Sequence, residues 1–76
     1  MAPRILIVED NVDLLTILRE VLSDDYEVAT AESGEAAITL ARTFEPDLVL
    51  LDLQLPGMNG ADTGMRIKQD AYPRVV

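Results

Sequence analysis

The sequence contains no cysteine, histidine or tryptophan, and its aromatic residues are two tyrosines and one phenylalanine. Without cysteine, the 76-residue chain can form neither disulfides nor thiolate metal sites. Without histidine, it lacks the usual general base and the commonest metal ligand. Any chemistry that these residues perform must therefore use carboxylates and hydroxyls.

Basic residues and long apolar runs are also scarce. The sequence has 6 basic and 14 acidic residues, which gives a net charge of -8. Such a charge repels phosphate backbones and anionic lipids, so we expect no direct binding to nucleic acid or membranes. No apolar run approaches the roughly 20 residues that a membrane span needs, and the N-terminus turns acidic too early for a secretory signal. The sequence predicts a soluble, cytoplasmic protein.

The hydrophobic residues that are present form short strands. Two apolar runs, Arg4–Val8 and Leu48–Leu51, are each followed at once by a carboxylate, and both predict strands buried on two faces. Residues 26–30 alternate in polarity, which is typical of a half-exposed strand at a sheet edge. Residues 74–76 look like the start of a fourth strand that the chain does not complete.

Helical patterns separate these strands. Asn11 and Ser33 are suitable N-caps for two amphipathic helices, which are expected to end at residues 23–25 and near Glu45, before Pro46. Their predicted apolar sides comprise Leu14, Leu15, Leu18, Val21 and Leu22 in the first, and Ala37, Ile38, Leu40, Ala41 and Phe44 in the second. A turn-rich stretch at 55–60 precedes a weaker third helix at about 61–69. This alternation predicts one α/β domain with a parallel sheet.

Carboxylates follow both apolar strands. Glu9 and Asp10 come after the first, and Asp52 comes after the third. If these strands are neighbours, the three acids meet at the edge of the sheet where ligands bind in parallel α/β folds. Three like charges need protons or a cation to offset them, and oxygen ligands favour Mg²⁺, with Mn²⁺ and Ca²⁺ as alternatives. A carboxylate beside Mg²⁺ is also suited to attack a phosphoryl group.

A single acid after a strand more often solvates a loop or caps the next helix. Three acids converging from two strands make that interpretation weaker than a metal site.

The motifs carry a resemblance to a known family. Glu9-Asp10-Asn11 after the first strand, and Asp52 followed by Pro56 and Gly60, resemble the receiver domain of bacterial response regulators. The resemblance implies a truncated flavodoxin-like, doubly wound sheet over residues 1–76, with strand order 2-1-3 and three βα units. It implies that Asp52 is the phosphoacceptor for a histidine kinase or phosphotransfer protein. The implied Mg²⁺ ligands are Glu9, Asp10, Asp52 and the backbone carbonyl of Gln54.

The resemblance covers the whole chain but only the first part of the family fold. The family's hydroxyl residue after the fourth strand and its lysine after the fifth are absent, and Lys68 cannot be mapped onto that role. Thr63 and Gly64 also stand where the family has apolar helix residues. In a three-stranded sheet the third strand becomes an edge, so we expect self-association there, most simply as a symmetric dimer. The expected apolar surface includes Leu53, Leu55, Val75 and Val76.

Three functions fit these observations. The first is a non-enzymatic phosphorelay receiver that is phosphorylated on Asp52. The second is a phosphorylation-silent interaction module that binds itself or a partner. The third is a phosphatase of the haloacid dehalogenase type, but that family has a second acid two residues after its nucleophile, where this sequence has Gln54.

Overall fold

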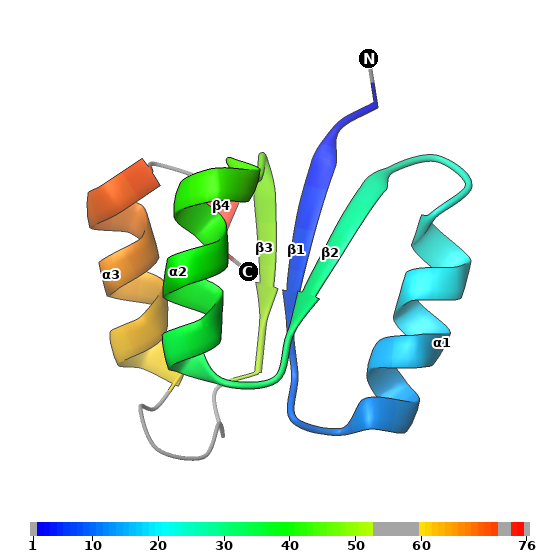
Figure 1. The fold of residues 1–76 in the computed structure, drawn as a ribbon, viewed down its shortest axis with the longest axis horizontal. Coiled ribbons are helices and arrows are strands. Elements are labelled where there is room, and N and C mark those ends of the chain that lie inside the picture. Colours follow the sequence, from blue (N-terminus) through cyan, green and yellow to red (C-terminus); the bar gives the residue numbers. More distant parts are fainter. Residues whose placement is uncertain (1, 53–59, 72–73, 76) are drawn as a thin grey trace.

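The computed structural model describes residues 2–52, 60–71 and 74–75, which form an α/β sandwich (Figure 1). The elements in chain order are β1 (Arg4–Val8), α1 (Val12–Leu22), β2 (Glu27–Ala31), α2 (Gly34–Phe44), β3 (Leu48–Leu51), α3 (Gly60–Ala71) and β4 (Arg74–Val75). Among the described residues, no helix has both the length and the apolarity that a membrane span requires.

The sheet is parallel, with strand order β2-β1-β3-β4. The predicted order 2-1-3 is confirmed, and β2 is an edge strand as expected. The fourth strand is short but formed, because Arg74 and Val75 pair with Leu48 and Val49. The expectation that the outer edge of β3 is free is therefore wrong over these two residues, although self-association itself stays a prediction.

Capping side chains define where the first two helices begin. Asn11 Oδ1 accepts a hydrogen bond from the Leu14 N–H at 3.1 Å, and Ser33 Oγ accepts one from the Ala36 N–H at 3.2 Å. Both predicted N-caps are confirmed. The second helix ends at Phe44, and its C-cap residue, Glu45, has φ 53° and ψ 63° in the left-handed region although it carries a side chain.

The two faces of the sheet are covered unequally. Helices α2 and α3 lie on one face and α1 lies alone on the other (Figure 1). The first face packs Leu6, Val8 and Val49 beneath α2 and α3, whereas the second packs Ile5 and Ile7 beneath α1. As a result β1 is buried on both faces, as predicted, but β3 is not.

Burial of β3 and α1 is the main difference from the sequence prediction. In β3 only Val49 is buried, and its three leucines are half-buried. In α1 only Leu15 is buried, Leu18 and Leu22 are half-buried, and Leu14 and Val21 are exposed. The common reason is that α1 is the only described helix on this face, so that its flank and part of β3 have no helix packed against them.

Small residues explain how α3 packs, and they include two that depart from the family pattern. Thr63 and Gly64 are buried, as is Ile67 in the next turn. The α2 residues in the same core are also small, namely Ala37 and Ala41. Small side chains allow two helices to approach closely, so this pair is consistent with the α2–α3 packing. The third helix begins at Gly60, slightly earlier than predicted.

Arg4 links four elements at the end of the sheet opposite the carboxylates. Its backbone N–H donates to Asp47 Oδ2 at 2.8 Å, and its carbonyl accepts from the Asp47 N–H at 2.8 Å. Its guanidinium donates to the last carbonyl of α2, that of Phe44, at 2.9 Å and pairs with Glu27 at 3.3 Å. These contacts hold the starts of β1, β2 and β3 and the end of α2 together, and they support the strand register that places the carboxylates.

Candidate functional site

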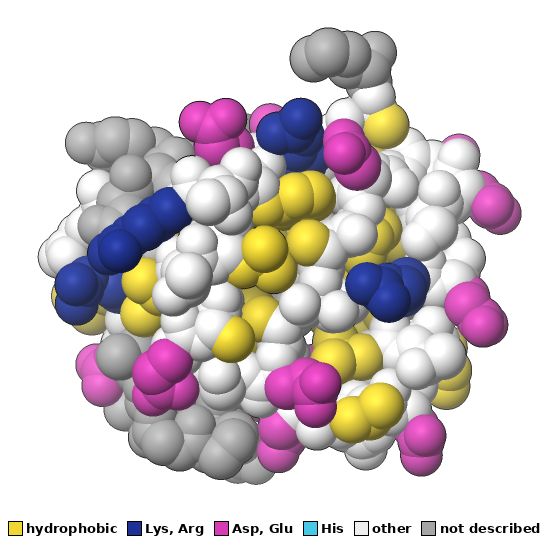
Figure 2. All heavy atoms as spheres, viewed as in Figure 1, with side chains coloured by type: hydrophobic (Ala, Val, Ile, Leu, Met, Phe, Trp, Pro, Cys, Tyr) yellow, Lys and Arg dark blue, Asp and Glu magenta, His cyan; other side chains and the backbone are white. Residues whose placement is uncertain are grey.

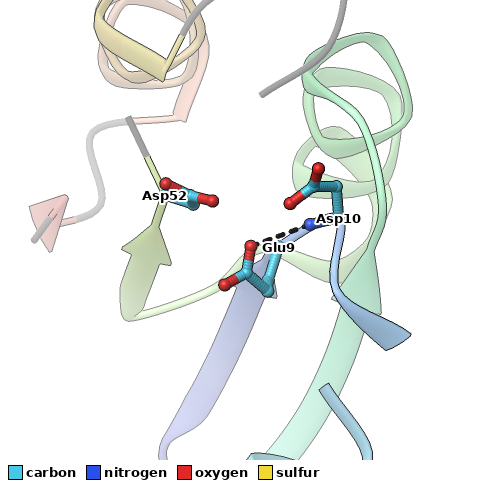
Figure 3. Close-up of side chains that lie close together, drawn as sticks. All are labelled: Glu9, Asp10 and Asp52. Carbon is cyan, nitrogen blue, oxygen red and sulfur yellow. Dashed lines mark hydrogen bonds between the residues drawn. The ribbon is translucent and has the colours of Figure 1, made fainter. Parts of the chain in front are cut away.

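Strand register brings the three acids together. Val8 is paired with Leu51 in the parallel β1–β3 ladder, so the residues that follow them, Glu9 and Asp52, are neighbours. The ladder continues past the strands, because the Asp52 N–H donates to the Val8 carbonyl at 3.0 Å. One ligand oxygen from each of Glu9, Asp10 and Asp52 lies within 4.8 Å of the others. The carboxylates face a common space at the carboxyl end of the sheet (Figure 3).

Backbone contacts fix the orientation of Glu9. Its N–H donates to the carbonyl of Ala31 in β2 at 3.0 Å. Its Oε2 accepts a hydrogen bond from the Asp10 N–H at 2.9 Å, drawn as a dashed line in Figure 3. Glu9 and Asp52 are half-buried. Asp10 is exposed and directly precedes Asn11, the N-cap of α1. The group is therefore held by the backbone and remains open to solvent on one side.

The neighbouring acids change the pKa of Glu9. A side-chain hydrogen bond with Asp52 raises the pKa of Glu9 most, and partial burial and the negative charge of Asp52 raise it further. A side-chain hydrogen bond with Asp10 also raises this pKa, whereas the Asp10 backbone N–H lowers it. The raised pKa means that the clustered carboxylates favour a bound proton, and a cation can replace that proton.

The donor set fits Mg²⁺. All three side chains offer carboxylate oxygens, and Mg²⁺ prefers oxygen ligands while keeping several waters, which the open side of the group allows. The sequence has no imidazole or thiolate that would favour a softer metal, since it lacks histidine and cysteine. The residues present are therefore suited to hold a hard divalent cation.

Parts of the predicted site lie outside the described residues. They are Gln54, whose carbonyl was expected to be a ligand, and Pro56 in the following turn. The apolar residues Leu53, Leu55 and Val76 of the predicted self-association surface are also outside them. Thr63, Gly64 and Lys68 lie in α3.

The structure adds one feature that the sequence did not indicate. A groove of about 300 Å³ adjoins the carboxylates and is lined by Ile7, Val8, Glu9, Leu18, Leu50, Leu51 and Asp52. Each apolar residue among them was predicted to be core, and no sequence signal separates a core leucine from one that lines an open groove. Among the described residues, one helix, α1, covers this face, and the groove lies beside it.

Comparison with known proteins places the chain among signalling domains. The family model for the response regulator receiver domain matches residues 5–76. The chain is 43% identical to the DNA-binding response regulator MtrA of Mycolicibacterium paratuberculosis over 77 residues, which is all of this chain and 34% of MtrA. It is 34% identical to the chemotaxis protein CheY of Halobacterium salinarum over 78 residues, which is all of this chain and 65% of that protein.

The fold agrees with solved structures of the same kind. The signal receiver domain of a putative Luxo repressor protein from Vibrio parahaemolyticus is 35% identical and superposes with a TM-score of 0.88. That match covers 99% of this chain and 59% of the solved chain. The chain thus spans about a third of the length of MtrA. It spans somewhat less than two thirds of CheY from Halobacterium salinarum and of the solved receiver domain from Vibrio parahaemolyticus.

Proposed function

The chain belongs to the response regulator receiver domain family, which serves two-component signalling, and we propose that it accepts a phosphoryl group on Asp52 with the help of Mg²⁺. The observation that carries the proposal is the convergence of Glu9, Asp10 and Asp52 within 4.8 Å. Membership in this family makes the chain a signalling module rather than an enzyme in its own right.

The proposed roles of the three acids are those that the resemblance to the receiver family implies. Asp10, which is exposed, and Asp52 would hold Mg²⁺ directly, and Glu9 would hold it through a water molecule. Asp52 provides the nucleophile: one carboxylate oxygen attacks phosphorus, the bond from phosphorus to the donor breaks, and an acyl phosphate forms. Bound Mg²⁺ would offset the negative charge of the carboxylates and of the phosphoryl oxygens during this in-line transfer. The backbone carbonyl of Gln54 is the remaining proposed ligand.

The proposed phosphoryl donor is a histidine kinase or phosphotransfer protein in the cytoplasm. A net charge of -8 supports a partner that is a protein rather than nucleic acid or membrane. Self-association through the outer edge of β3 is not part of this proposal, because β4 already pairs with Leu48 and Val49.

The test is phosphorylation of the purified chain by acetyl phosphate with Mg²⁺, followed by intact mass. We expect a gain of one phosphoryl group by the native chain and none by Asp52→Asn. Asp24→Asn removes the same charge from an exposed turn outside the cluster, and this control should be phosphorylated like the native chain.

Two outcomes would contradict the proposal. Phosphorylation of Asp52→Asn to the native extent would place the phosphoryl group elsewhere. Absence of any adduct on the native chain, at Mg²⁺ concentrations that measurably stabilise it, would show that the three acids bind the cation without transferring phosphate. The chain would then be a phosphorylation-silent receiver.

A further inference from the structure

We draw no further inference here: the strongest candidate, the outer edge of β2, where hydrophobic side chains are visible between α1 and α2 (Figure 2) and a small cavity is lined by Arg19, Thr30 and Glu32, carries none because nothing in the described structure shows what covers it.

Discussion

Replacing Asp52 by asparagine should stabilise the protein in the absence of divalent cations. The Asp52 and Glu9 carboxylate oxygens lie within 4.8 Å of each other. When the pH is above the raised pKa of Glu9, so that both carboxylates are ionised, two unit charges at that distance repel by about 0.9 kcal/mol in water and by about 3.5 kcal/mol at an effective dielectric constant of about 20. The group is open to solvent on one side, so the lower value applies, and Asp52→Asn should raise the free energy of unfolding by about 1 kcal/mol. For a domain of this size that corresponds to a melting temperature about 4–8 °C higher.

Mg²⁺ should reverse this order. A ligand that binds only the folded state, at a concentration about ten times its dissociation constant, stabilises by about 1.4 kcal/mol. The native chain should gain this amount, while Asp52→Asn, with one ligand removed, should gain little. The advantage of the variant without Mg²⁺ should therefore disappear when Mg²⁺ is added.

The measurement is urea unfolding followed by circular dichroism, with and without Mg²⁺ at constant ionic strength. Asp24→Asn serves as the control, because it changes the net charge equally but lies outside the carboxylate group. The reasoning is refuted if Asp52→Asn is less stable than the native chain without Mg²⁺, or if Mg²⁺ stabilises both chains equally.

Three further predictions concern single residues. Because the pKa of Glu9 is raised mainly by its hydrogen bond with Asp52, the folded state holds this proton more tightly than the unfolded chain, whose Glu pKa is about 4.3. The stabilisation from Glu9 should therefore be lost as pH rises through its raised pKa. Over the same pH range the affinity for Mg²⁺, measured by calorimetry, should increase, and an affinity that does not change with pH would contradict this. Glu45→Gly should raise the free energy of unfolding by about 0.5–1 kcal/mol, because glycine adopts the left-handed conformation without strain. Urea unfolding measures this change, and a lower free energy of unfolding in the variant would show that Glu45 is not strained. Arg4→Met should lower the free energy of unfolding by about 1–3 kcal/mol, because it removes the hydrogen bond to the Phe44 carbonyl. Glu27→Gln should lower it by less than about 1 kcal/mol, because the Arg4–Glu27 ion pair is exposed. Equal losses in the two variants would assign the stabilisation to the ion pair instead.

Local sequence signals determined most of the secondary structure. The N-caps Asn11 and Ser33 and the end of α2 before Pro46 are all where the sequence predicts them. Each depends on a side chain and the few residues next to it, so no distant contact is needed to predict it. The convergence of Glu9 and Asp52 could be predicted for a related reason. In a parallel sheet, residues that follow neighbouring strands must lie at the same end.

The tertiary structure decided which of the predicted apolar residues are covered. Val49 and Leu50 are adjacent in the same apolar run, yet one is buried under α2 and α3 while the other lines an open groove. The periodicity of α1 likewise could not separate the half-buried Leu18 from the exposed Val21. Hydrophobic patterns state which side of an element is apolar, but burial depends on a second element packing there. That is a property of the whole chain's topology, and on the α1 face the described structure supplies a single helix.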